Sequence, residues 1–206
     1  TAAVTVLERL AAETELSKRA LKEILRKGAV WLTRGKGTRR QRRAKAALLA
    51  GARDERFSVI LAHQSGTGGA SLHRDNLGEP IGSITEGYPH WFVPGYAEYA
   101  DREDALPLDA HYLLALIAPR SVLLGNSWRD VWSDPAGAWR AAEAASPVWS
   151  LYDVEGLNQT RLDEIDVSGH IAYHIRPATH GVRGEDWDAF LAFLDAQLQT
   201  RSGPEP

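Results

Sequence analysis

Two side chains that could transfer protons together stand in separate loops of this sequence. The segment 126-NSWRDVWSDP-135 holds Asp130 beside tryptophan, and the segment 176-RPATHG-181 holds His180. A histidine oriented by a carboxylate is a general base that can activate a hydroxyl nucleophile. Asp130 could equally be a loop or helix-capping carboxylate, and His180 an ordinary loop histidine before a helix. Their placement after two successive apolar runs favours the catalytic interpretation.

The elements that must position these loops alternate between strand and helix. Apolar runs of strand length predict strands at 57–64, 120–127 and 171–177. Helices are expected at 45–52, 107–118, 135–145 and 185–198. This alternation predicts an α/β fold with a mostly parallel sheet, whose chemistry lies in the loops at the carboxyl ends of the strands. Asp130 and His180 follow the chain order of hydrolases that use a nucleophile, an acid and a histidine.

The composition limits the class of protein. A chain of 206 residues with 44% hydrophobic residues can form one domain, or one domain and a small additional unit. The absence of cysteine excludes disulfides, thiolate metal sites and a cysteine nucleophile. No apolar run is long enough to span a membrane and no signal peptide is visible, so we expect no membrane partner and leave the localisation open. The chain opens with Thr1 rather than Met, which leaves room for a natural start upstream.

The charge is distributed unevenly along the chain. Residues 1–45 hold 13 basic and 4 acidic residues, whereas the remainder holds 11 basic and 23 acidic residues. Two helices are expected within 4–28 and a strand at 29–35, before the basic run 36-KGTRRQRRAK-45. That run is either a solvated arm or an arm that contacts phosphates.

The words LSKRALKEILRKGAVWLTRGKGTRRQRRAKAAL, within about residues 4–48, resemble the N-terminal RNA-binding segment of large-subunit-type pseudouridine synthases. The resemblance implies RNA as a partner of residues 1–45, contacted by Arg39, Arg40 and Arg43. The Arg-Leu-Asp motif that carries the catalytic aspartate of that family does not occur in this chain. Only the RNA-binding part of the resemblance is therefore retained.

A series of short strings spans residues 44–198: AKAALLAGARDERF, HQSGTGGASLHRDNLGE, YPHWF, LPLDAHYLLALIAPRSVLL, DVWSDP, ASPV, IAYHIRPATHG and DWDAFLAFLD. Together these strings resemble the glucuronoyl esterases of carbohydrate esterase family 15. The resemblance implies the C-terminal part of an α/β-hydrolase fold, with an incomplete parallel sheet. It also implies cleavage of esters between 4-O-methyl-glucuronic acid of xylan and lignin alcohols by a Ser-His-acid triad, without a metal or other cofactor.

The esterase resemblance assigns roles residue by residue. His180 matches the general base, and Asp130 is left as the acid because Gln64 fills the alternative acid position. Arg42 matches an oxyanion-hole residue. For the substrate, Lys45 and Glu79 match residues that hold the sugar, and Trp132 matches an aromatic residue beside it.

The position of the serine nucleophile holds Gln41. The family elbow Gly-x-Ser-Arg-x-Gly-Lys aligns its serine with Gln41 when its lysine is placed on Lys45. A glutamine amide cannot form the acyl intermediate of a serine alkoxide. The charged residues 34–43 also cannot form the central buried strand that precedes an elbow. We therefore expect impaired hydrolysis.

Three functions remain open for this chain. We expect an RNA-binding-like unit at 1–45, a truncated hydrolase domain at 46–198 and a disordered tail at 199–206, with a fusion through the shared string 44-AKAALLAG-51. The first function is an impaired ester hydrolase. The second is an RNA-binding module joined to a non-catalytic hydrolase fragment. The third is a protein that only binds a uronic acid.

Overall fold

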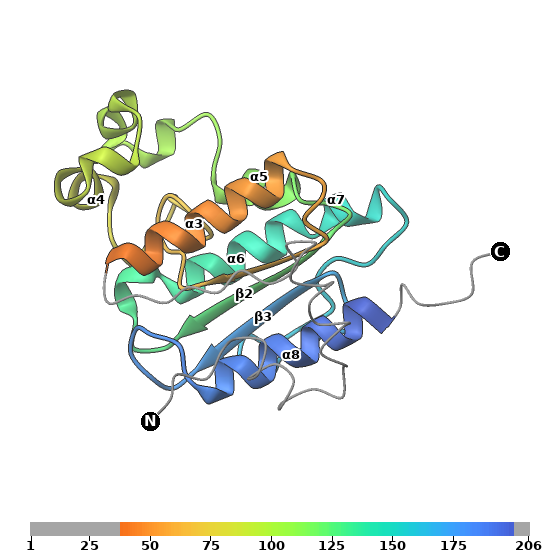
Figure 1. Ribbon diagram of the computed structural model, residues 1–206. Helices are drawn as coiled ribbons and strands as arrows, with labels where there is room; N and C mark the ends of the chain where they lie inside the picture. The colour runs from red at the N-terminus through yellow and green to blue at the C-terminus, as the bar shows by residue number, and fades with distance from the viewer. Residues whose placement is uncertain (1–37, 200–206) are drawn as a thin grey trace.

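The computed structural model describes residues 38–199, and its centre is a parallel sheet with helices on both faces (Figure 1). The strands are β1 (Val59–His63), β2 (Ser121–Ser127) and β3 (Ile171–Arg176), and their order in the sheet is β1-β2-β3. Val59 pairs with Ser121, and Val122 pairs with Ile171. Because every strand runs in the same direction, the loops after β1, β2 and β3 meet at one edge of the sheet.

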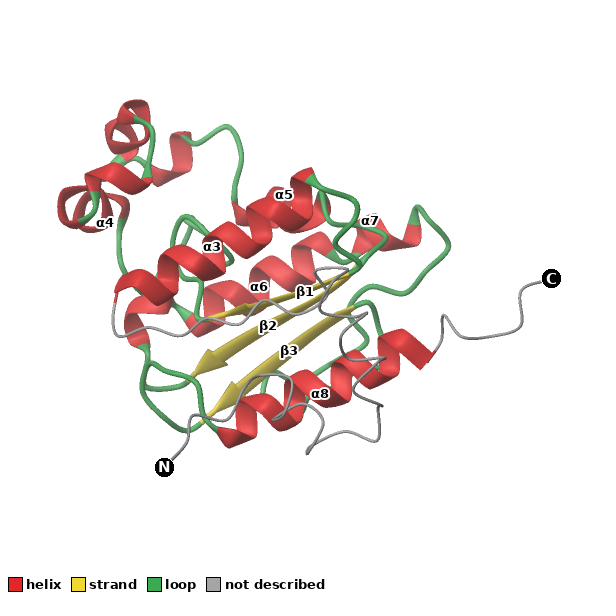
Figure 2. Ribbon diagram, viewed as in Figure 1, coloured by secondary structure: helices red, strands yellow, loops and turns green. Residues whose placement is uncertain are grey.

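The strands are apolar because helices cover both faces of the sheet (Figure 2). All seven residues of the central strand β2 are buried. One face is covered by α3 (Thr38–Arg53), α5 (Ala110–Ala115) and α6 (Pro135–Ala145), followed by the short α7 (Pro147–Ser150). The other face is covered by α8 (Gly184–Gln199), which packs Phe190, Phe193 and Leu194 against the strands.

Short helices between β1 and α5 stand away from the sheet (Figure 1). They are α4 (Ile81–Gly87), η1 (Pro89–Trp91), η2 (Pro94–Tyr99) and η3 (Glu103–Ala105), and a further turn, η4 (Val131–Ser133), follows β2. None of these short helices is among the elements predicted from the sequence. Within residues 38–199, no helix has the length and apolar character needed to cross a membrane.

The structure confirms the predicted α/β class and the three predicted strands, each within two residues at either end. Helix α6 begins at Pro135, as expected from a proline in the first turn, and Asp134 caps it by accepting a hydrogen bond from Gly137 N at 2.9 Å. The predicted start of the helix at 45–52 is wrong, since the corresponding helix α3 begins at Thr38 rather than Lys45.

The earlier start of α3 has a simple cause in its composition. Its first seven residues, TRRQRRA, contain no glycine or proline, and arginine, glutamine and alanine all favour helix. The basic stretch therefore continues into the apolar helix, and the proposed boundary between residues 45 and 46 lies inside α3. The elements expected within 4–35 and the tail from residue 200 lie outside the described residues, while Gln199 is the last residue of α8.

Candidate active site

Asp130 and His180 meet where the loops after β2 and β3 lie side by side. The His180 Nδ1 atom is 2.7 Å from Asp130 Oδ2. Two backbone hydrogen bonds join the loops beside this pair, from Trp128 N to Arg176 O and from Arg129 N to Ala178 O, each 3.0 Å long. The structure thus brings together the two candidate catalytic side chains that the sequence places 50 residues apart.

The geometry of this pair suits a general base. Asp130 is held in a turn, because its N–H donates to Ser127 O at 3.0 Å and its carbonyl accepts from Ser133 Oγ at 2.8 Å. When Nδ1 of His180 donates to the Asp130 carboxylate, Nε2 carries the free lone pair and can accept a proton. The Asp130 side chain is only 6% exposed, whereas that of His180 is 26% exposed. The histidine is therefore the member of the pair that a substrate can reach.

Gln64 lies between the two loops and presents an amide instead of a carboxylate. It follows β1 directly, and its side chain is buried. Its Nε2 donates to Ser127 Oγ at 2.8 Å, and its Oε1 accepts from Gly181 N at 2.7 Å. Because the Gln64 amide is neutral, Asp130 is the carboxylate that the described residues place against His180.

Lys45 is buried on the second turn of α3 and faces a set of polar and aromatic groups. Its ammonium donates to Ser65 O and lies 5.6 Å from the centre of the Trp91 ring. Burial lowers the pKa of Lys45 to about 8, and the charge of Glu79 opposes this change. Burial likewise raises the pKa of Glu79, and the charge of Lys45 opposes that rise. The two side chains are therefore both partly desolvated, and each charge affects the pKa of the other.

The loop that carries Glu79 docks on the turn that carries Trp132. Glu79 N donates to Trp132 O at 3.1 Å. This approach requires glycine at position 78, because a Cβ there would lie 2.7 Å from Trp132 O and 2.9 Å from Val131 O. Trp132 itself is 60% exposed. A carboxylate and an accessible indole are thus placed on adjoining segments, which is an arrangement that suits a sugar ring.

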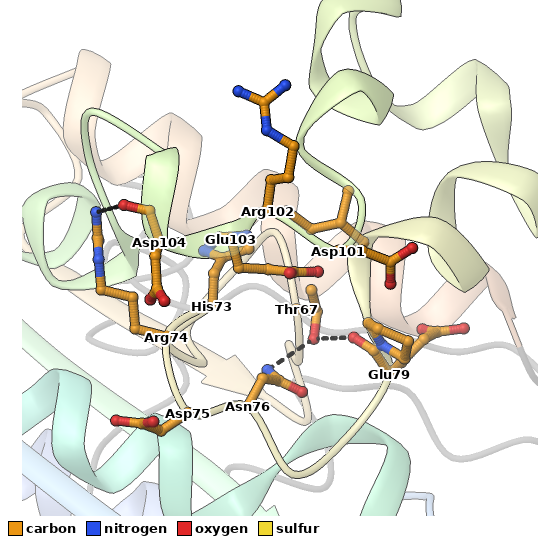
Figure 3. A pocket seen from close by; sticks show the side chains of 12 residues that line it. Thr67, His73, Arg74, Asp75, Asn76, Glu79, Asp101, Arg102, Glu103 and Asp104 are labelled. Carbon is orange, nitrogen blue, oxygen red and sulfur yellow. Dashed lines mark hydrogen bonds between the residues drawn. The ribbon is translucent and has the colours of Figure 1, made fainter.

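A polar cavity of about 340 Å³ opens next to Glu79 (Figure 3). Thr67 Oγ1 donates to Glu79 O at 2.7 Å, and Asn76 Nδ2 donates to Thr67 Oγ1 at 3.2 Å, so hydrogen bonds connect three of the lining residues (Figure 3). The cavity's other lining residues with ionisable side chains are His73, Arg74, Asp75, Asp101, Arg102, Glu103 and Asp104. Polar lining of this kind suits hydroxyl groups better than an apolar ligand.

Trp91 and the buried pair of Arg176 and Asp186 are not among the site residues predicted from the sequence. The only signal for Trp91 is the aromatic run 88-YPHWFVPGY-96, in which Tyr88 stacks on Trp91 at 4.2 Å between ring centres. Arg176 and Asp186 are ten residues apart and carry no recognisable motif. Their proximity to His180 comes from the way the chain turns between β3 and α8.

Other predicted site residues lie at the start of α3. The structure describes their helical backbone but not their side chains. These residues are Gln41, Arg42 and the three arginines assigned to RNA contact, Arg39, Arg40 and Arg43. Their roles stay predictions. Among residues 38–199, no group of three or more His, Asp or Glu side chains is arranged to hold a metal ion.

Comparison with known proteins gives a consistent family. The family model described as "Glucuronyl esterase, fungi" matches residues 38–153, more than half of the chain. Carbohydrate esterase MZ0003, from an unknown prokaryotic organism, is 41% identical over 159 residues, which are 76% of this chain and 37% of that protein. 4-O-methyl-glucuronoyl methylesterase 1 of Phanerochaete chrysosporium is 32% identical over 120 residues, which are 55% of this chain and 25% of that protein.

A solved structure agrees with these matches. The structure titled "Glucuronoyl Esterase from Solibacter usitatus" superposes with a TM-score of 0.70 and 40% identity, over 76% of this chain and 40% of that chain. The present chain therefore spans between a quarter and two fifths of the length of these relatives. None of these matches is to a pseudouridine synthase. The chain belongs to the glucuronoyl esterase family.

Proposed function

We propose that this chain holds the acid–histidine pair and the sugar-binding residues of a glucuronoyl esterase site. We further propose that its ability to hydrolyse esters is impaired. The substrate class is the ester of 4-O-methyl-glucuronate, as in glucuronoxylan linked to lignin alcohols. The observation that carries the proposal is the 2.7 Å hydrogen bond between His180 and Asp130 at the carboxyl edge of a parallel sheet. Relatives named 4-O-methyl-glucuronoyl methylesterase support this substrate class.

In the proposed chemistry, His180 Nε2 takes the proton of the attacking hydroxyl and then gives it to the departing alcohol. Asp130 holds the imidazole in the required tautomer and stabilises the imidazolium that forms. Lys45 and Glu79 hold the uronate hydroxyls, with the Trp132 indole beside the ring. Arg42 stabilises the oxyanion. No cofactor takes part.

The weak element of the proposed site is the nucleophile. Gln41 aligns with the family serine, and its amide has no proton that His180 could remove to form an alkoxide. In a serine hydrolase, loss of the nucleophile alone lowers kcat by about a million-fold. The proposal therefore combines binding of the uronate with hydrolysis that is slow or absent.

Binding and turnover are measured separately on the full chain. Calorimetry and NMR titration with glucuronate should detect binding that weakens at least tenfold in Glu79→Gln. Glu155→Gln is the matched control, because Glu155 is an exposed carboxylate that contacts Asn158. Release of benzyl alcohol from benzyl glucuronate should stay at the buffer rate. No uronate binding would refute the substrate class, and turnover that disappears in His180→Ala would refute the impairment.

A separate proposal concerns residues 1–45, which we infer to bind RNA through Arg39, Arg40 and Arg43. It is supported by 13 basic residues against 4 acidic ones in this segment. Affinity of the full chain for a short RNA should fall steeply as salt increases from 50 to 200 mM, on the order of a hundred-fold or more for several phosphate contacts. Salt-independent binding, or none at 50 mM, would refute it.

A further inference from the structure

The backbone of Gly181, which directly follows His180, is held at both its N–H and its C=O. Its N–H donates to Gln64 Oε1 at 2.7 Å. Its carbonyl accepts from His63 Nε2 at 2.9 Å and from the Arg176 guanidinium. Gly181 has a φ of +137°, a conformation that favours glycine. Three side chains thus bond to the backbone N–H and C=O of this loop residue and restrain the two successive peptide groups to which these atoms belong.

The three groups that hold Gly181 come from the ends of two strands. His63 is the last residue of β1 and Gln64 follows it, while Arg176 is the last residue of β3. Gln64 also donates to Ser127 Oγ at the end of β2. These strand ends are fixed by the pairing of neighbouring strands, His63 with Gly125 and Ser127 with Arg176. Hydrogen bonds therefore connect Gly181 directly to residues at the ends of β1 and β3, and through Gln64 to the end of β2.

The buried carboxylate of Asp186 binds the Arg176 side chain that contacts Gly181. Asp186, in the first turn of α8, is fully buried and accepts from Arg176 Nε at 2.8 Å, from Arg183 N at 2.7 Å and from His174 Nε2 at 3.1 Å. The desolvation penalty of a buried ion pair offsets much of the attraction between its charges, so the pair alone does not explain the stability of the fold. Its geometric effect is specific: Asp186 orients the Arg176 guanidinium towards the Gly181 carbonyl.

We propose that Gln64, Arg176 and Asp186 are positioning residues that set the His180 imidazole against Asp130 by restraining the backbone N–H and C=O of Gly181. The inference rests on the proposed function, since it gives His180 the role of general base. Gln64 is suited to its place because one amide supplies both a donor, to Ser127, and an acceptor, to Gly181. This restraint needs no contact between these residues and a substrate.

The test is a spectroscopic measurement on the full chain, labelled with ¹⁵N-histidine. The His180 Nδ1 proton, bonded to Asp130, should give a downfield signal with slow exchange. Gln64→Met, which keeps the length of the side chain and removes both hydrogen bonds, should abolish this signal or speed its exchange at least tenfold. Gln64→Glu keeps an acceptor for Gly181 N–H and should retain it. Should Gln64→Met not fold, Gln64→Asn retracts the amide from Gly181 and should give the same loss.

Gln159→Met is the matched control for a lost buried amide. Gln159 is buried, donates to Arg161 O at 2.8 Å and accepts from Tyr173 N at 3.2 Å, and it lies outside the loops that carry Asp130 and His180. This variant should leave the His180 signal unchanged. An unchanged signal in Gln64→Met, or an equal loss in Gln159→Met, would overturn the proposal. Because the readout is independent of turnover, a chain that binds no uronate would contradict the proposed function without affecting this result.

Discussion

Replacing Lys45 with methionine should change how the stability of the fold depends on pH. The pKa of Lys45 is lowered from 10.5 to about 8, chiefly by burial. Between these two values the unfolded chain binds a proton that the folded chain does not, so the stability of the parent protein rises with pH across this window. Below pH 8 the buried ammonium destabilises the fold to its full extent. The methionine variant has no such group.

The magnitude follows from the two pKa values. Their difference corresponds to about 3 kcal/mol over the full window, of which about 2.5 kcal/mol falls between pH 7 and pH 10. The free energy of unfolding of the parent protein should therefore rise by about 2.5 kcal/mol relative to Lys45→Met over that range. Other groups that titrate there, such as exposed tyrosines, affect both proteins equally and cancel in the difference.

The assay is urea denaturation of both proteins at pH 7, 8, 9 and 10, analysed with a common slope. Arg120→Met is the matched control: Arg120 is a half-buried cation that donates to Asp54 O and Phe57 O at 3.1 Å each, and a guanidinium stays charged through this range. Its difference from the parent should not change with pH. A flat difference for Lys45→Met, or one that changes in the opposite direction, would refute the assignment of Lys45 as a desolvated ammonium.

Two further substitutions test other parts of the fold and site. Asp186→Asn should destabilise the fold by about 3–5 kcal/mol in urea denaturation, because it leaves the buried Arg176 guanidinium without its carboxylate, and a loss below about 1 kcal/mol would show that the pair is not formed. Trp132→Ala should change the free energy of unfolding by less than about 0.5 kcal/mol, because the residue is 60% exposed, while weakening glucuronate binding measured by calorimetry; unchanged binding would remove Trp132 from the sugar site.

The sheet and the acid–histidine pair were predictable because their signals are local. Runs such as 120-RSVLLGNS-127 have a continuous apolar centre, Val122 to Leu124, that the sheet buries, and parallel strands bring their following loops to one edge whatever the loops contain. Asp130 and His180 needed only that rule to be placed near each other. Their hydrogen bond required the structure.

The elements that escaped prediction lack a periodic pattern. The segment 81–105 forms four helices of three to seven residues, two of which begin with a proline, Pro89 and Pro94. Helices of this length are too short to show an amphipathic stripe. The start of α3 was misplaced for the opposite reason: the basic residues before Lys45 suggested an arm, whereas their propensity favours helix. The restraint on Gly181 depends on contacts up to 118 residues apart, which no local pattern encodes.

The start of α3 also bears on the nucleophile. In a hydrolase elbow the serine stands on a sharp turn between a strand and the helix that follows, where its hydroxyl is exposed at the edge of the sheet. Residue 41 does not occupy such a turn, because the helix has already begun at Thr38, three residues earlier. A serine at this position would belong to the first turn of a regular helix instead of a strand-to-helix turn. The departure from the family elbow therefore concerns the backbone as well as the side chain, and this is why Gln41→Ser alone should not raise turnover of benzyl glucuronate, whereas a rise that depends on His180 would show that the elbow survives.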